Sequence, residues 1–233
     1  MNKQDSKPVL PVCFCIHRNG SMGARTALNG REVSRLNLVA AGIRNFVETG
    51  LSPNAPYELD AAVLVFSGST MWIQKFGTVT YADQIPDLKY DGVDCCLGEA
   101  LAMALDAIEN RVERSKREGQ ECLRPILVMV SAGNENYGRA DVLSRSSERC
   151  GALIQQQKLT AVMYAMTTRA NEELLRSAAP GGTVEYVRTA EIIDKLSGIG
   201  SYAQANVHRL QEPLRDASPY ILGIYTDVLQ GRG

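Results

Sequence analysis

The chain has 233 residues, of which 45% are hydrophobic and 22% are charged, and 25 lysines and arginines balance 26 aspartates and glutamates. This composition is typical of a folded domain and not of a disordered or fibrous chain, and the length suffices for a substantial core. A formal net charge of -1 gives no electrostatic footprint for nucleic acid or for an anionic membrane, so we expect neither as a partner.

Membrane spans and secretion are not indicated either. The longest apolar runs, residues 63–66 and 126–130, are far shorter than the roughly 20 residues of a membrane-spanning helix. Pro8 and Pro11 interrupt the apolar run near the start, and no small-residue cleavage site follows it, so we expect a strand there and a cytoplasmic protein. The six cysteines lack paired C-x-x-C spacing, and we expect most of them to be reduced and buried.

In the first half of the chain, strand and helix signals alternate without an internal repeat. The continuous apolar residues 10–16 predict a buried strand, and a polar loop follows. Apolar side chains then recur at helical spacing over residues 34–49, which predicts an amphipathic helix. Residues 57–66 and 70–76 predict two strands, and the three residues between them are too few for anything but an antiparallel hairpin.

The second half continues this alternation after a loop that runs to Cys96. The helix that follows has an apolar face as far as Ile108, and the charge-dense residues 109–121 are interpreted as a solvated last turn and loop rather than a docking surface. The remaining predicted elements are strands at residues 125–130, 159–166 and 184–187 and helices at residues 142–157, 171–179 and 191–210, the last with an expected weak point at Gly198 and Gly200.

Together these elements predict an α/β fold: a doubly wound, mostly parallel Rossmann-like sheet with one antiparallel hairpin strand and helices on both faces. Such sheets bind ligands at the carboxyl ends of their strands, where the strand order reverses. We therefore expect a site in the loops after residue 16, between residues 76 and 96, and after residue 130. The predicted organisation is an N-terminal lead (residues 1–9), one domain (residues 10–212) and a C-terminal extension (residues 213–233).

Each of these three loops resembles a motif of the von Willebrand factor A (VWA) domain family. Residues 16–23 (IHRNGSMG) resemble the first motif, in which a strand ends in Asp-x-Ser-x-Ser-Met. Residues 95–101 (CCLGEAL) resemble the second, a Thr two residues before Leu-Gly, and residues 125–134 resemble the third, a strand ending in Thr-Asp-Gly. The Leu-Pro-Val opening and the Arg-Pro before the fourth strand are most similar to the cytosolic bacterial branch found with tellurite-resistance and stress-response systems.

The resemblance implies a metal-ion-dependent adhesion site, in which intact members hold a divalent cation that an acidic group of the partner completes. In this chain His17 stands at the position of the first Asp, Asn19 at that of the first Ser, Cys95 at that of the Thr and Ala132 at that of the second Asp, while Ser21 is retained. Mg²⁺ requires hard oxygen ligands, usually with one or two carboxylates. We therefore expect a degenerate site without metal or other cofactor, whose five positions line a crevice that faces a partner.

Three alternatives remain open. A slip of one residue in the second motif would bring Asp94 to the crevice and restore one carboxylate. His17 and Cys95 are ligands that suit zinc, if Cys96, Asp94 or Glu135 completed the set, which would leave a metal-dependent adhesion module with substituted ligands. Finally, Cys95 or Cys96 with His17 is the one conceivable dyad of a small Cys-dependent enzyme.

The preferred interpretation is a non-catalytic protein-interaction or adaptor module in a bacterial cytosolic stress-response or defence complex. As the resemblance implies, its partner would be a protein such as a kinase, a phosphatase or an ATPase of the same system. The rim of the crevice offers Arg and Tyr, which are favoured at interfaces, among Arg18, Arg25, Asn134, Glu135, Asn136 and Tyr137. The C-terminal extension either packs back on the domain or docks on a partner through Tyr220, Ile221, Leu222, Ile224 and Tyr225.

Overall fold

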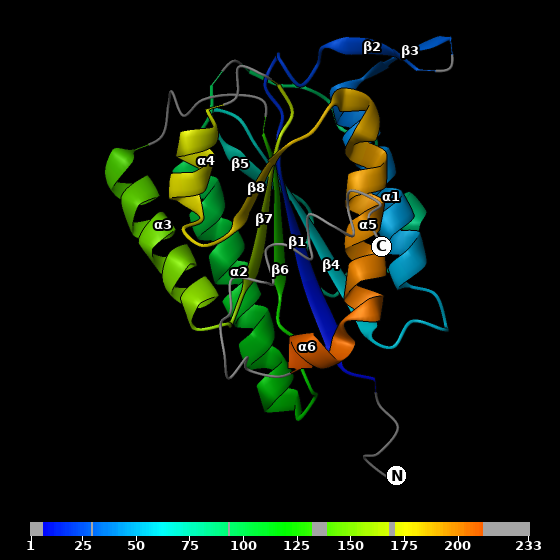
Figure 1. The fold of residues 1–233 in the computed structure, drawn as a ribbon, viewed down its shortest axis with the longest axis vertical. Coiled ribbons are helices and arrows are strands. Elements are labelled where there is room, and N and C mark those ends of the chain that lie inside the picture. Colours follow the sequence, from blue (N-terminus) through cyan, green and yellow to red (C-terminus); the bar gives the residue numbers. More distant parts are fainter. Residues whose placement is uncertain (1–6, 29, 93, 132–138, 168–170, 212–233) are drawn as a thin grey trace.

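A six-stranded sheet with the order β5-β4-β1-β6-β7-β8 forms the centre of the molecule (Figure 1). The computed structural model describes residues 7–28, 30–92, 94–131, 139–167 and 171–211. All neighbouring strands of this sheet pair in parallel except β5, which is antiparallel to β4. The strands are β1 (Val9–His17), β4 (Glu58–Phe66), β5 (Thr70–Gln74), β6 (Ile126–Ser131), β7 (Thr160–Ala165) and β8 (Thr183–Tyr186). The predicted α/β fold class is confirmed.

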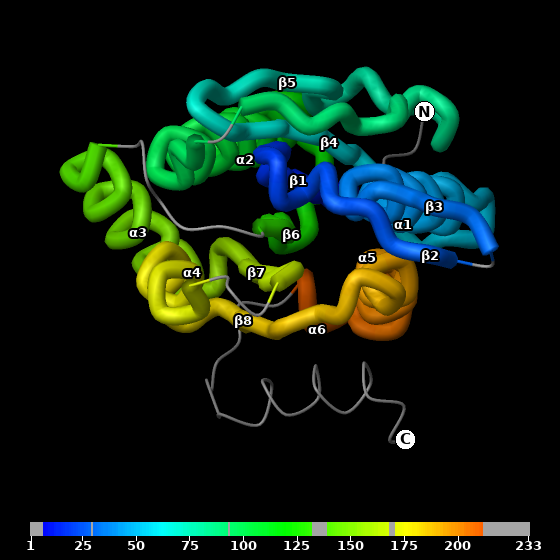
Figure 2. Tube along the Cα trace, turned by 90° about the horizontal axis from the view of Figure 1, so that it is seen from above, coloured from blue at the N-terminus to red at the C-terminus, as the bar shows by residue number. Residues whose placement is uncertain are grey.

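Helices cover both faces of the sheet, as the view from above shows (Figure 2). Helices α1 and α5 pack on one face, and α2, α3 and α4 pack on the other. The helices are α1 (Arg35–Gly50), α2 (Leu97–Glu118), α3 (Ala140–Gln155), α4 (Glu172–Ala178), α5 (Ile192–Ala205) and α6 (Val207–Gln211), with 3-10 helices at Ala82–Gln84 and Thr189–Glu191. None of the helices in the described ranges is long and apolar enough to cross a membrane.

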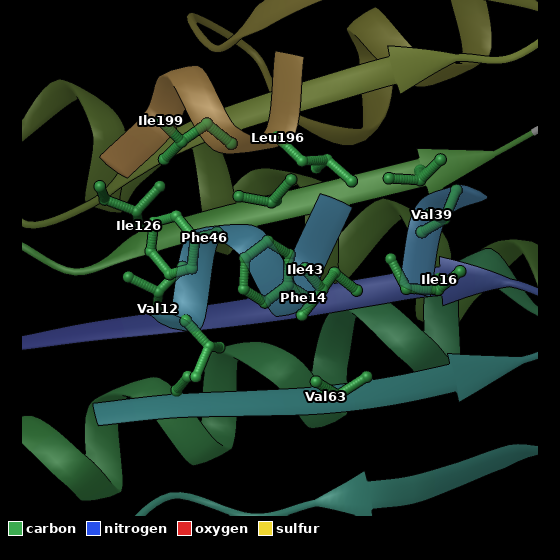
Figure 3. Packing of buried hydrophobic residues seen from close by; sticks show 14 of the residues in the cluster. Val12, Phe14, Ile16, Val39, Ile43, Phe46, Val63, Ile126, Leu196 and Ile199 are labelled. Carbon is green, nitrogen blue, oxygen red and sulfur yellow. The ribbon is translucent and has the colours of Figure 1, made fainter. Parts of the chain in front are cut away.

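Strand β1 is buried over its whole length because it lies between β4 and β6 and is covered on both faces. Its alternate side chains enter two separate cores. Phe14 points toward α1 and meets Phe46 edge to face, with 5.2 Å between the ring centroids (Figure 3). Cys13 and Cys15 point to the other face, toward α2. This explains why a continuous apolar run, and not an alternating one, marks this strand in the sequence.

The loop predicted between the first strand and the first helix contains a two-stranded hairpin that sequence analysis missed. Strands β2 (Arg25–Leu28) and β3 (Arg31–Ser34) pair antiparallel and project beyond α1 (Figure 1). Leu28 and Val33 pack against the core, and Gly30 in the turn has a φ of 76°, which glycine adopts without strain. Ser34 then caps α1, because its side chain accepts a hydrogen bond from the backbone N–H of Asn37 (3.1 Å).

Helix α2 is longer than predicted, because residues up to Glu118 are helical instead of forming a loop. A buried ion pair on this segment joins it to β4: Arg111 donates through Nε to Asp60, and each side chain is only 10% exposed. Asp60 also accepts from the backbone N–H of Gly77 (2.6 Å), and Arg111 donates to Ser115 (2.6 Å). The charge density of this segment therefore includes structural contacts and is not only a solvated surface.

At the other end of α2, Gly98 allows α3 to approach closely. A Cβ atom at Gly98 would lie 2.7 Å from backbone atoms of Leu143, and Ser146 donates to the Gly98 carbonyl (3.2 Å). The final predicted helix, residues 191–210, is divided into α5 and α6 at Asn206 and not at the two glycines. Gly200 instead packs against the ring of Phe46.

Candidate functional site

The carboxyl ends of β1, β4 and β6 meet at the end of the sheet from which the β2–β3 hairpin projects (Figure 1). After β1, the chain adds β4 along one edge of β1. It later passes through α2 and adds β6 along the opposite edge of β1. The strand order thus reverses at β1, which is where doubly wound sheets bind ligands. The loops after β1 and before α2 come together there, as the sequence predicts.

His17, the last residue of β1, has no exposed surface and joins three segments of this region. Its ring stacks on Phe66 at the end of β4, with 4.9 Å between centroids and an interplanar angle of 8°. Its Nε2 lies 3.2 Å from the main-chain oxygen of Asp94, in the loop before α2. Its Nδ1 lies 3.2 Å from the hydroxyl oxygen of Ser131, the last residue of β6.

These contacts define the protonation of the ring. A carbonyl oxygen only accepts, so Nε2 carries the hydrogen and donates to Asp94, and Nδ1 accepts the hydroxyl hydrogen of Ser131. Burial lowers the pKa of His17 to about 4, although the hydrogen bond to Asp94 acts in the opposite direction. The imidazole is therefore neutral near pH 7, and both ring nitrogens are engaged in contacts within the protein.

Main-chain hydrogen bonds hold the same loops together around His17. Arg18 donates its N–H to the carbonyl of Phe66 (2.8 Å) and accepts from the N–H of Asp91 (2.7 Å). Its guanidinium also pairs with the Asp91 carboxylate at 3.0 Å, and Cys96 N–H donates to the Ser67 carbonyl (2.7 Å). The region is thus held in place by contacts within the chain.

A smaller set of side chains from these loops faces outward. Ser21 is exposed and donates to the Asn19 side-chain oxygen (2.6 Å), and Arg25 on the hairpin is 70% exposed beside Glu32. Tyr90 is 64% exposed, and its ring lies against Gly23, where an added Cβ would come within 2.6 Å of it. We call Ser21, Arg25, Tyr90 and Asp91 the upper surface.

The predicted crevice is corrected at two positions. His17 and Cys95 were expected to face a partner, but their exposures are 0% and 1%, because the ring fills the space between three segments and the thiol is part of the core under α2. Arg18 is mostly buried by its pairing with Asp91. Ser21 and Arg25 are exposed, and Asn19 is partly exposed. Ala132, Asn134, Glu135, Asn136, Tyr137 and the extension residues Tyr220, Ile221, Leu222, Ile224 and Tyr225 lie outside the described residues.

The cysteines near His17 form part of the core between β1 and α2. Cys95 and Cys96 are 1% and 4% exposed and share this core with Cys13 and Cys15. Burial, followed by the neighbouring thiols of Cys13, Cys96 and Cys95, raises the pKa of Cys15 well above its usual value. A buried, protonated thiol is a poor nucleophile and a poor metal ligand, so this arrangement is typical of structural cysteines.

The donor set does not fit the divalent cation that the VWA resemblance implies. The position of the first carboxylate holds a neutral imidazole whose two nitrogens are already bonded within the protein. At the other described motif positions exposed or partly exposed to solvent, Asn19 and Ser21 carry neutral oxygens that bond to each other. Within the described residues, no group of three or more His, Cys, Asp and Glu side chains is placed to share a metal. The described motif positions therefore offer Mg²⁺ neutral dipoles alone, which poorly offset its dehydration.

Sequence analysis missed Tyr90 and Asp91 as members of the upper surface. The loop that contains them was identified, but nothing in its local pattern distinguishes these two residues from their neighbours. The available signal was the composition of a long connection, residues 75–96, that carries two exposed tyrosines, Tyr81 and Tyr90. An aromatic side chain in a loop next to a strand-order reversal is a reasonable interface candidate.

Comparison with protein-family models and with curated proteins finds no match. Solved structures match the fold. The vWF domain of the type V pili tip protein Mfa5 from Porphyromonas gingivalis has a TM-score of 0.62 at 10% identity, covering 88% of this chain and 97% of that one. The von Willebrand factor type A protein from Catenulispora acidiphila has a TM-score of 0.59 at 15% identity, covering 85% and 43%. BatB from Bacteroides thetaiotaomicron has a TM-score of 0.53 at 14% identity, covering 86% and 98%.

The chain therefore has the fold of a VWA domain. It spans less than half of the Catenulispora chain and nearly all of the Mfa5 domain. At identities of 10–15% the likeness concerns the fold alone.

Proposed function

We propose that this chain is a non-catalytic protein-interaction module that works without a divalent cation. The observation that carries the proposal is the position of His17, which connects β1, the loop before α2 and the end of β6 through its two nitrogens and its stacked ring. These are the segments at which the resemblance places a bound metal. Here the protein itself supplies the connections, so the upper surface is arranged before any partner binds, which reduces the cost of binding.

The chemistry of the upper surface supports a protein partner. It combines the exposed ring of Tyr90 with Arg25, residue types that protein interfaces favour as anchors, beside the Ser21 hydroxyl and the Asp91 carboxylate. The buried thiols near His17 support a role without catalysis, because a nucleophile must reach its substrate. We further propose a cytoplasmic adaptor of a bacterial stress-response or defence system, with a kinase, phosphatase or ATPase as partner, on the basis of the sequence resemblance.

Thermal unfolding with added metals tests the cation-independence. A ligand bound only by the folded state stabilises it by about 2.7 kcal/mol at a hundredfold excess over Kd. We expect no stabilising shift in Tm with millimolar Mg²⁺, Mn²⁺, Ca²⁺ or Zn²⁺. A specific increase with one of these ions, lost in Cys95→Ser, would instead establish a substituted metal site.

Partner capture tests the surface. The double variant Arg25→Glu/Tyr90→Ser should lose partners that the wild-type chain captures from its source cell, and chelator should not affect wild-type capture. The matched control is Arg145→Glu/Tyr186→Ser: Arg145 on α3 is 70% exposed, as is Arg25, and Tyr186 at the end of β8 is 42% exposed. Equal capture by both double variants would place the partner elsewhere, and loss on chelation would contradict the cation-independence.

A further inference from the structure

A groove of about 570 Å³ has α6 in its wall. Helix α6 lies at the end of the sheet opposite the β2–β3 hairpin (Figure 1). The walls of the groove come from the second half of α2, the connection into β6, the end of α3 with the following turn, and α6. Its apolar lining comprises Ile108, Val112, Leu123, Pro125, Leu153 and Leu210. The groove is separate from His17 and from every residue of the proposed function.

The lining of the groove includes one polar side chain without a hydrogen-bond partner among the described residues and two partly buried apolar side chains. Gln157 has a φ of 58°, and its side-chain oxygen is buried without a hydrogen-bond partner in the described part of the chain. A buried acceptor without a donor is costly, by an amount comparable to a lost hydrogen bond. Both Val112 and Leu153 are only partly buried, so the groove presents apolar surface to an occupant. An occupant that suits this surface carries apolar side chains.

The chain itself supplies such a segment at this place. Leu210 and Gln211, the last described residues, line the groove, and the Leu210 carbonyl accepts from the N–H of Arg124 in its wall (3.0 Å). Residues 212–233 therefore begin at the groove. Their sequence contains an apolar run, residues 220–228 (YILGIYTDV), with two tyrosine hydroxyls as donors. The nine residues from 211 to 220 reach at most about 30 Å, so the run can return to the groove from its starting point.

We propose that residues 212–233 turn back after Gln211 and place their apolar run in this groove of the same molecule. The occupant in cis has an advantage over a partner segment, because the connection through Gln211 gives it an effective concentration of about millimolar. Binding removes apolar side chains of both surfaces from water. The extension thus completes the domain at one end and leaves the upper surface open at the other.

Cys122 provides a native reporter for this contact. It lines the groove and is partly exposed, whereas the other five cysteines are buried with exposures of 0–4%. The experiment measures the rate at which a maleimide alkylates Cys122 in the 233-residue chain, with mass spectrometry to assign the site. The perturbed variant is Ile221→Asp/Ile224→Asp, and the control is Ser218→Asp/Thr226→Asp, which adds equal charge at polar positions of the same segment.

We expect alkylation of Cys122 to accelerate at least about tenfold in Ile221→Asp/Ile224→Asp, since the covered state must open before a reagent enters, and to stay within about twofold of wild type in the control. Hydrogen exchange should rise in the same variant at residues 108–116 and 153–158. Equal alkylation rates in wild type and the apolar-run variant would overturn the proposal. Protection that increases with protein concentration would overturn it too, in favour of a second copy of the chain as occupant.

Discussion

Acidification should destabilise this protein through His17. The pKa of His17 is about 4 in the folded protein against 6.5 for the ordinary side chain. Between these values the unfolded chain binds more protons than the folded one, so stability falls as the pH decreases from 6.5 to 4 and is unaffected by this residue above 6.5. The difference of about 2.5 between the two pKa values corresponds to a free energy of unfolding that is about 3 kcal/mol lower near pH 4 than at neutral pH.

The assay is urea unfolding at several pH values between 7 and 4, followed by the fluorescence of Trp72, the single tryptophan. Carboxylates also titrate in this range, so the informative quantity is the difference between wild type and His17→Gln. Glutamine can donate to the Asp94 carbonyl but does not titrate, and we expect it to remove about 3 kcal/mol of the pH-dependent loss. His208→Gln, at an exposed position of α6, should leave the loss intact. Equal pH-dependent losses in wild type and His17→Gln would refute the assignment of a buried neutral imidazole.

Three further stability predictions follow from single contacts, each measurable by urea unfolding at neutral pH. Asp60→Asn should lower the free energy of unfolding by about 3 kcal/mol, because it leaves the buried Arg111 charge uncompensated. Adding Arg111→Met should recover part of that loss. If the effects of the two substitutions simply added, the ion pair would not account for the loss. Gly98→Ala should lower the free energy of unfolding by about 2 kcal/mol, because the added Cβ overlaps the α3 backbone. Gly20→Ala, with no atom within 4 Å of the added Cβ, should be nearly neutral. A larger loss for Gly20→Ala than for Gly98→Ala would contradict the close approach of α2 and α3. Ser34→Ala should cost about 1 kcal/mol by removing the cap of α1, while a neutral result would show that the hairpin alone positions that helix.

The fold was predictable because its strands and helices differ in the period of their apolar residues. The buried run of β1 and the helical spacing of α1 identify these elements, and the short connection between β4 and β5 determines their antiparallel pairing. Hairpin β2–β3 has no such signal, because its strands are four residues long and mostly polar. The end of α2 was marked by Gly119, which has a φ of 66°, but the density of charge before it favoured a loop.

The site was only partly predictable, since residue type does not reveal burial. The motif resemblance places His17 at the strand-order reversal, as the structure does, and a histidine in place of a carboxylate is interpreted there as a candidate zinc ligand. In the structure, both ring nitrogens of His17 instead form hydrogen bonds within the protein, with the Asp94 main-chain oxygen and the Ser131 hydroxyl. Those two acceptor and donor groups come from segments 77 and 114 residues away, so no local pattern contains them.

The β2–β3 hairpin has a consequence for how binding to this protein is mapped. Within the described residues, β2 and β3 pair only with each other. The outer edge of each strand therefore has main-chain N–H and C=O groups that a strand of a partner could pair with. Recognition through such groups is almost blind to side-chain identity. Alanine substitutions keep the main-chain groups, so alanine scanning would not detect a contribution of this hairpin to binding affinity, even a large one. Proline at an outward-facing position, which deletes a donor without altering the fold elsewhere, is the substitution that would detect it.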